Sequence, residues 1–460
     1  MGFFLSILYL VTYYLTPVAI FGSFADYRIE LIIAAFLLIV SLPALNESFI
    51  FKTPQSLALI GLGAATFFSV VFGMHWAGGG LPAFLQFIPN AFAYFLVCVH
   101  CNSIKRLRIL VLMMLLVCLF VIAHGAIDLQ HTVPVSTDQA ENGDVPPENI
   151  SPYFLGMSNS ANQWFYRLKG LGEIDDPNDF AQLIVCVLPL VFIFWSPEKT
   201  LRNFLFVLLP VSALLYGAYL THSRGAIMAL LAMVFVATRR RLGTVPSLLI
   251  VGALFAAASA LHVAGGRDIS VEAGEDRTAL WGEGLQLFKA YPLFGVGFGA
   301  MPDHAGQTAH NSLVVCAAEL GIVGLYFWAL FLFPTVRDTL EIATPTKVGE
   351  GVPIVLEVTP YPNTIGTIET VDREEICRLG WLILLSLTGF LVAAWFLSRA
   401  FVVTVFLLGG IVEVVFQMAL RRGMVAPRLP AGRVMRNSAG LAIALILTMY
   451  VMLRVVNVMH

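Results

Sequence analysis

Long apolar runs recur along almost the whole chain, separated by shorter polar segments. A helix needs about 20 predominantly apolar residues to cross a bilayer. Counting runs near this length predicts an all-α, polytopic transmembrane helix bundle of about 12–14 spans. Thirteen candidate spans lie near 3–22, 29–45, 55–73, 81–100, 109–124, 180–196, 203–220, 225–238, 246–263, 311–334, 379–397, 401–420 and 438–456.

The polar segments between the runs divide the chain into five parts. We expect N-terminal spans, a long acidic loop, a central core with its own long loop, a further loop, and C-terminal spans. The Thr-, Val-, Pro- and Gly-rich composition of the further loop favours a small β-ribbon. The parts are residues 1–124, 125–179, 180–334 (with the loop 264–310), 335–377 and 378–460.

Composition supports a membrane protein with lipids as its surroundings. Hydrophobic residues make up 58% of the chain and charged residues 12%, against about 25% charged residues in soluble proteins. The net charge of −2 gives no basic field for nucleic acid. The N-terminus lacks a basic region and a cleavage site, so we expect a retained first span. No internal repeat is visible, unlike in many transporters.

The distribution of Lys and Arg predicts the orientation of the spans, because cytoplasmic loops are enriched in these residues. Eighteen of the 27 Lys and Arg residues lie in one set of loops, which we assign to the cytoplasm. The long loops 125–179 and 264–310 then lie outside, and 335–377 inside. Nine basic residues remain for the outer side: Arg28, Arg167, Lys169, Arg224, Arg267, Arg277, Lys289, Arg399 and Arg454.

Residues suited to chemistry gather in the predicted outer segments. Arginines there are scarce, and each either anchors a span or meets an anion. The planar guanidinium group suits the phosphates of a diphosphate. His310 stands at the outer end of a span beside Asn311, where an imidazole can accept a proton from a sugar hydroxyl.

Other polar groups allow alternative interpretations. Asp175, Asp176 and Asp179 either bind a divalent cation or cap a helix and pair with Arg167 or Lys169, with Asp176 as N-cap and Pro177 at the first helical position. Glu413 with Gln417 is either a proton relay or a satisfied pair inside the bundle. Residues 276–290 predict an amphipathic helix that lies on the membrane surface or against the bundle.

Several motifs together resemble a known family. His310-Asn311, nine residues and then Gly321-Ile322-Val323-Gly324 resemble the signature of the O-antigen ligases, within the O-antigen ligase and polymerase superfamily. The segments 291–297 (YPLFGVG), 223–225 (SRG) and 167–178 (RLKGLGEIDDPN) resemble further motifs of that family in the same order. The resemblance covers about residues 160–335, over a third of the chain.

The resemblance implies a glycosyltransferase of the GT-C kind in the bacterial inner membrane, with its active site on the periplasmic side and no metal or cofactor. It would transfer glycan from undecaprenyl diphosphate to an acceptor in lipopolysaccharide or exopolysaccharide synthesis. His310 is implied to be the catalytic base. The donor diphosphate is implied to be bound by Arg224 and Arg277. The resemblance is less close at Arg167, which is assigned to the same role, and Asn311 is expected beside the substrate.

The acceptor stays open at this point. Lipid A core would make the protein a ligase, a second lipid-linked glycan a polymerase, and Ser or Thr of a protein an O-oligosaccharyltransferase. The segment between Arg277 and His310, in which acceptor recognition is expected, is shorter than in O-antigen ligases, and this favours a polymerase. The histidine motif in turn favours a ligase. A flippase or transporter is the alternative from another class, but it predicts charges along a mid-membrane path rather than at the outer rim.

Overall fold

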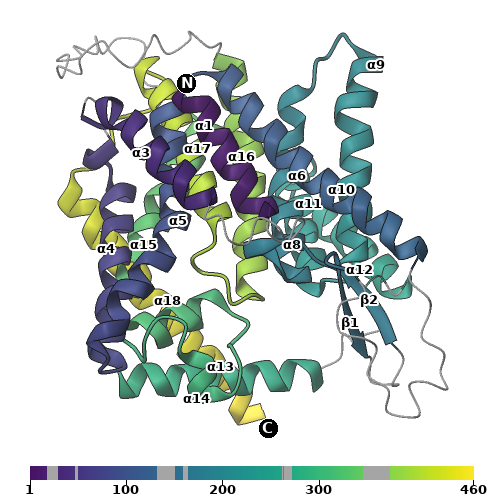
Figure 1. Cartoon of the computed structure of the whole chain (residues 1–460). Coiled ribbons are helices and arrows are strands. Elements are labelled where there is room, and N and C mark those ends of the chain that lie inside the picture. The colour runs from purple at the N-terminus through teal and green to yellow at the C-terminus, as the bar shows by residue number, and fades with distance from the viewer. Residues whose placement is uncertain are drawn as a thin grey trace. The chain divides into compact units, whose positions relative to one another are not determined.

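The computed structural model describes residues 1–17, 29–46, 50–131, 151–158, 164–261, 263, 272–345 and 373–459. The predicted all-α fold is confirmed, and every predicted span overlaps a helix (Figure 1). Within the described residues, nine helices are long and apolar enough to cross a membrane. Three shorter apolar helices are Gly2–Leu15, Ile29–Ala44 and Thr244–Ala260. The protein is therefore a multi-pass membrane protein.

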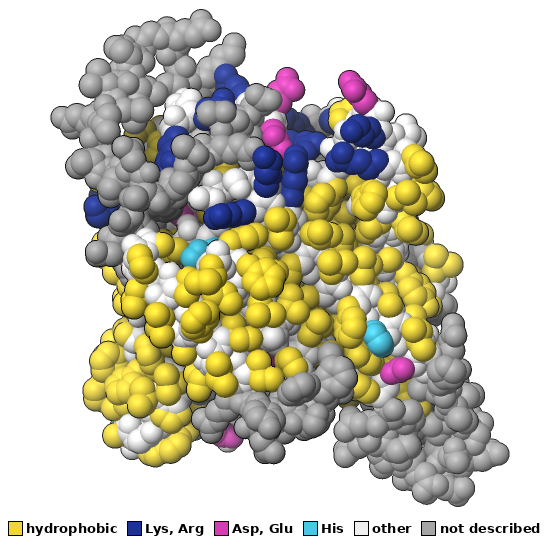
Figure 2. Space-filling model, turned by 45° about the horizontal axis from the view of Figure 1, so that its top comes forward, with side chains coloured by type: hydrophobic (Ala, Val, Ile, Leu, Met, Phe, Trp, Pro, Cys, Tyr) yellow, Lys and Arg dark blue, Asp and Glu magenta, His cyan; other side chains and the backbone are white. Residues whose placement is uncertain are grey.

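The surface has the character expected of a bundle in lipid. Large apolar side chains such as Phe4, Leu201 and Leu249 are at least 70% exposed. Figure 2 shows hydrophobic side chains over much of the face drawn, with Lys and Arg side chains gathered toward one edge. A soluble monomer rarely exposes so much contiguous apolar surface. Lipid tails are the surroundings that this surface fits.

The chain forms two compact units, and the first comprises Met1–Val40, Lys105–Ser270 and Leu385–Ala393. One antiparallel hairpin accompanies its helices, with Leu155 opposite Arg167. The hairpin lies within the predicted loop 125–179, where no strand was expected. Figure 1 shows it at the end of this unit opposite α9, in agreement with the predicted alternation of loops. The elements are α1 (Gly2–Leu15), α3 (Ile29–Asn46), α6 (Ile104–His131), β1 (Phe154–Ser158), β2 (Trp164–Leu168), η4 (Gly172–Ile174), α8 (Pro177–Leu190), η5 (Val191–Phe194), α9 (Thr200–Asn203), η6 (Phe204–Leu208), α10 (Leu209–Leu220), α11 (Arg224–Leu242) and α12 (Thr244–Ala260).

The second unit comprises Ser41–Ile104, Val271–Leu384 and Ala394–His460. Its central helix α15 contacts α4, α13, α17 and α18. Aromatic rings fill the core, where Phe331 and Phe406 meet edge to face at 5.2 Å between centroids. The elements are η2 (Ile50–Lys52), α4 (Pro54–Phe68), the π-helical turn η3 (Ser69–Gly73), α5 (Ala77–His100), α13 (Glu272–Ala290), α14 (Met301–Ala305), α15 (Ser312–Ala343), α16 (Arg373–Trp395, shared with the first unit), α17 (Val403–Arg421) and α18 (Ala431–Met459).

The amphipathic helix predicted over 276–290 is confirmed as α13. Leu280, Trp281 and Leu285 are buried, and the helix contacts α15 and α18. Its apolar face therefore packs against the bundle, which decides between the two placements that the sequence left open.

Helix α15 is broken at Gly321, although the sequence predicts one continuous span over 311–334. Gly321 has φ 63° and ψ −161°, outside the helical region. The segment before α14 inserts at the break, where the N–H of Val296 donates to the Ala318 carbonyl at 2.9 Å and that of Ile322 to the Pro292 carbonyl at 2.8 Å. The freed backbone groups are thus satisfied inside the bundle, as a membrane requires.

Beyond the break, α15 continues to Ala343, past the expected end of the span at 334. The predicted β-ribbon of the 335–377 loop falls on residues 346–372, which lie outside the described part of the chain.

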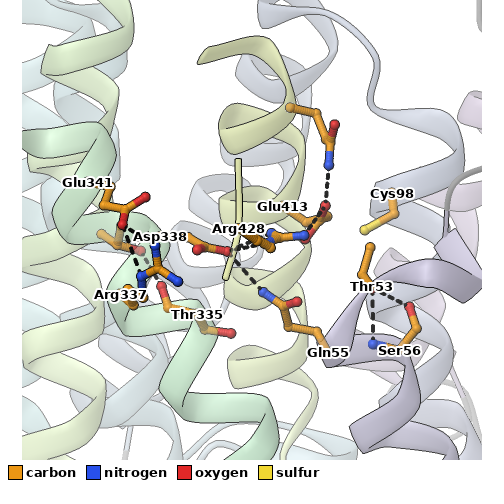
Figure 3. Close-up of polar contacts among 12 residues, drawn as sticks. Thr53, Gln55, Ser56, Cys98, Thr335, Arg337, Asp338, Glu341, Glu413 and Arg428 are labelled. Atoms are coloured by element: carbon orange, nitrogen blue, oxygen red, sulfur yellow. Dashed lines mark hydrogen bonds and ion pairs between the residues drawn. The ribbon is translucent and has the colours of Figure 1, made fainter. Parts of the chain in front are cut away.

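A buried ionic cluster joins helix α17 to two loops that the sequence assigns to one side of the membrane (Figure 3). Arg428 lies 2.6 Å from Asp338 Oδ2 and 2.5 Å from Glu413 Oε2, and both carboxylates are fully buried. Gln417 donates to Glu413 at 2.9 Å, which confirms the satisfied pair inside the bundle. Burial lowers the pKa of Arg428, but the two carboxylates raise it by more, so the guanidinium stays charged.

Candidate functional site

Arg167 is buried at the end of β2, where its guanidinium group holds two neighbouring segments of the first unit together. Its Nε–H donates to the Thr221 carbonyl at 2.8 Å, and its Nη2 donates to Asn178 Oδ1 at 2.8 Å. The Ser223 hydroxyl donates to the same Asn178 oxygen at 2.9 Å. With a side chain only 3% exposed, Arg167 positions the turn that leads into Arg224.

Arg224 is the first residue of α11, and Ser223 is the N-cap of that helix. The Ser223 hydroxyl accepts from the Ala226 N–H at 3.4 Å. A helix N-terminus carries partial positive charge, and an arginine placed there adds to it. Such an end attracts an anion, and phosphate binding at helix N-termini is a common solution. The Ser-Arg-Gly motif therefore places an arginine at a helix end whose partial charge is positive.

The acidic residues before α8 are engaged in local contacts. Asp176 is the N-cap of α8 and accepts from the Asn178 N–H at 2.7 Å, with Pro177 directly after it, so both predictions are confirmed. Asp175 pairs with Lys169 at 2.5 Å, as the second interpretation expected. Capping and pairing thus account for these two carboxylates.

In the second unit, both the carbonyl oxygen and the N–H of the peptide group between Ala309 and His310 form hydrogen bonds with side chains. The Ala309 carbonyl accepts from Trp281 Nε1 at 2.8 Å. The His310 N–H donates to the Ser398 hydroxyl at 2.7 Å. His310 itself has φ 48°, in the left-handed region that a non-glycine residue rarely adopts. Strain of this kind costs about 1–3 kcal/mol and gathers at functional sites.

Asn311 follows as the N-cap of α15. Its Oδ1 accepts from the backbone N–H groups of Leu313 and Val314 at 3.0 and 3.2 Å. The side chain is fully buried, and among the described residues its Nδ2 has no hydrogen-bond partner. Asn311 therefore fixes the start of the helix through its Oδ1.

Arg277 lies on α13 four residues before Trp281. Side chains at this spacing share one face of a helix. Because Trp281 donates to the Ala309 carbonyl, Arg277 lies on the face of α13 turned toward the His310 segment. Arg277 and His310 thus both lie in the second unit, whereas Arg167 and Arg224 lie in the first.

Trp281 and Ser398 are supporting residues that the sequence did not reveal. Trp281 was predicted only as part of an apolar helix face. Ser398 lies between two spans in a segment without a motif. Their contacts with residues 309–310 join positions 28 and 88 residues apart in the chain. Only the tertiary fold brings them together.

Residues 209–329 match the protein-family model described as O-antigen ligase. Over these residues the chain is similar to the O-antigen ligases. No curated protein matches the chain significantly. The matched residues contain Arg224, Arg277, His310, Asn311 and Gly321, whereas Arg167 lies before them.

The O-antigen ligase match confirms the resemblance predicted from the motifs and indicates a membrane glycosyltransferase of the ligase or polymerase type. The structure gives a physical reason for two motif glycines of the matched residues. A Cβ on Gly321 would lie 2.4 Å from the Leu293 carbonyl oxygen, and one on Gly295 would lie 2.3 Å from the Glu319 carbonyl carbon. Both residues also have positive φ, so only glycine fits without displacement.

Proposed function

We propose that this protein transfers a glycan from undecaprenyl diphosphate to an acceptor hydroxyl at the periplasmic face of the bacterial inner membrane. The observation that supports this most is His310, held in a strained conformation between Trp281 and Ser398 within the residues that match the O-antigen ligase model. A base that must meet a hydroxyl in one orientation benefits from such fixation.

In the proposed reaction, the acceptor hydroxyl attacks the anomeric carbon of the donor sugar. His310 takes the hydroxyl proton as general base. The bond between the anomeric carbon and the phosphate oxygen breaks, and undecaprenyl diphosphate leaves with the electron pair. Attack from the face opposite the leaving group inverts the anomeric configuration.

Arg224 and Arg277 are proposed to bind the diphosphate and to stabilise the negative charge that grows on it as the bond breaks. Fixed guanidinium groups do this without a metal ion, and Arg224 adds the field of the α11 N-terminus. Arg167 is proposed to act indirectly, because its guanidinium group binds Thr221 and Asn178 and so holds the turn before Arg224. Asn311 is proposed to offer its Nδ2 to the substrate.

The test is transfer by the purified full-length protein in lipid nanodiscs with synthetic undecaprenyl-diphosphate glycan. Lipid A core, a second lipid-linked glycan and a Ser- or Thr-containing peptide are offered in turn, with and without EDTA. We expect product with one acceptor class, an inverted linkage by NMR, and no loss in EDTA. Transport of the intact donor between leaflets without product would instead favour the flippase.

A further inference from the structure

The segment between α16 and α17 is bound closely to the His310 segment. The Ser312 hydroxyl donates to the Leu397 carbonyl at 2.7 Å and accepts from the Arg399 N–H at 3.1 Å. The His310 N–H donates to Ser398. Trp328 Nε1 donates to the Ala400 carbonyl at 3.1 Å. Each residue from 397 to 400 thus has a hydrogen bond to the core or to the base segment, and the backbone of Arg399 is fixed next to His310.

Two structural elements meet the base from different sides. In a trans peptide the C=O and N–H bonds point in opposite directions. The Ala309 carbonyl points to Trp281 on α13, and the His310 N–H points to Ser398. The helix that carries Arg277 and the segment that carries Arg399 therefore lie on opposite sides of this peptide group.

The contacts of Arg399 differ from those of the other predicted outer-face cations of the second unit. Within the described residues, these are Arg277, Lys289, Arg399 and Arg454. Lys289 and Arg454 lie over the ring of Tyr450, at 5.1 and 5.9 Å from its centroid. The backbone N–H of Arg399 is instead bonded to Ser312, and Arg277 lies on α13 one turn before Trp281, which donates to the Ala309 carbonyl. The Arg399 side chain is half-buried. Its backbone N–H is held by the Ser312 hydroxyl.

We infer that Arg399 binds an anionic group of the acceptor, and that the acceptor is therefore an acidic glycan bearing a carboxylate or a phosphate. This inference rests on the proposed function. In an inverting displacement the base and the leaving group stand on opposite faces of the sugar. Arg277 is assigned to the leaving diphosphate, and we therefore assign the segment on the other side of the His310 peptide to the acceptor. A guanidinium group there selects an oxyanion.

The experiment uses the full-length protein in nanodiscs, synthetic undecaprenyl-diphosphate glycan as donor, and three matched acceptor glycans. One acceptor is neutral, one carries a uronate carboxylate, and one carries a phosphate monoester. For the wild type we expect an acceptor KM about tenfold or more lower for an acidic glycan than for the neutral one. The glycan with the lower KM identifies the source of the anionic group.

Three variants separate the role of Arg399 from general effects. In Arg399→Ala the preference for the acidic glycan should disappear while the donor KM stays unchanged, because the Ser312 contact uses the backbone N–H. Arg399→Lys should keep part of the preference. Arg454→Ala, on another outer-face arginine of the same unit, should keep all of it.

Two results overturn the inference while leaving the glycosyltransferase intact. One is transfer by the wild type with equal KM for neutral and acidic acceptors. The other is an Arg399→Ala variant whose acceptor preference is unchanged, or in which only the donor KM changes. If no acceptor supports transfer, the proposed function fails, and equilibrium binding of the same three glycans still decides whether Arg399 selects an anion.

Discussion

The backbone N–H of His310 donates a hydrogen bond of 2.7 Å to the hydroxyl of Ser398. The bond joins the segment that leads into the broken helix α15 to the segment before α17. It acts on the backbone of His310. Ser398 is therefore expected to be a positioning residue that acts through His310.

Replacing Ser398 tests this relationship. Ser398→Ala leaves the His310 N–H without its acceptor, which releases the strained φ of His310, so we expect kcat to fall about tenfold with little change in donor KM. Ser398→Thr keeps the hydroxyl group and should restore most of kcat. Equal kcat values for the alanine variant and the wild type in the nanodisc assay would remove the positioning role.

The two arginines assigned to the diphosphate should act on the donor. Arg224→Ala and Arg277→Ala each remove a charged hydrogen-bond donor, so we expect kcat/KM for the lipid-linked donor to fall about tenfold or more. Lys289→Ala serves as a control, because Lys289 lies on α13 but over the ring of Tyr450. Unchanged donor kinetics in both arginine variants would disprove the diphosphate assignment.

Gly321 should be required for folding of the broken span. Gly321→Ala places a Cβ at positive φ and 2.4 Å from the Leu293 carbonyl oxygen, so we expect a loss of at least about 1–2 kcal/mol. Thermal unfolding in detergent measures this as a lower midpoint. Gly440→Ala is the matched control, since nothing lies within 4 Å of its Cβ position in α18. An equal midpoint for both variants would contradict the account of the break.

The ionic cluster at the other end of α15 should contribute to stability. Arg428→Ala leaves two buried carboxylates without their cation, and we expect a loss of about 3–5 kcal/mol. Arg337→Ala breaks a pair with Glu341 that is partly exposed on one helix, and should cost about 0.5 kcal/mol. Thermal unfolding of the two variants side by side measures the difference. Similar midpoints would show that the cluster contributes little.

The sequence predicted the helices well because apolar runs of span length report burial directly. It did not predict the break at Gly321, since the flanking residues 320–323 are as apolar as any span. The groups that satisfy the break come from residues 292–297, and only the fold brings them there. The hairpin was also missed, although the aromatic run Trp164-Phe165-Tyr166 has the composition of a strand.

For the site, the motifs indicated His310, Arg224 and Arg277, because their residue types and spacing carry the family signature. They did not indicate the fixation of His310, which depends on Trp281 and Ser398 from distant segments. Arg167 shows the opposite case. Its type and position suggested a ligand contact, whereas the described hydrogen bonds of its buried guanidinium group are with Thr221 and Asn178.

The most direct test of the account compares transfer rates of the wild type and His310→Ala in nanodiscs, at saturating donor and acceptor. A general base contributes about 10²–10⁴-fold, so we predict that the variant inserts and binds donor normally but transfers at least about 100-fold more slowly. Full turnover by His310→Ala would contradict the assignment of this histidine as the base.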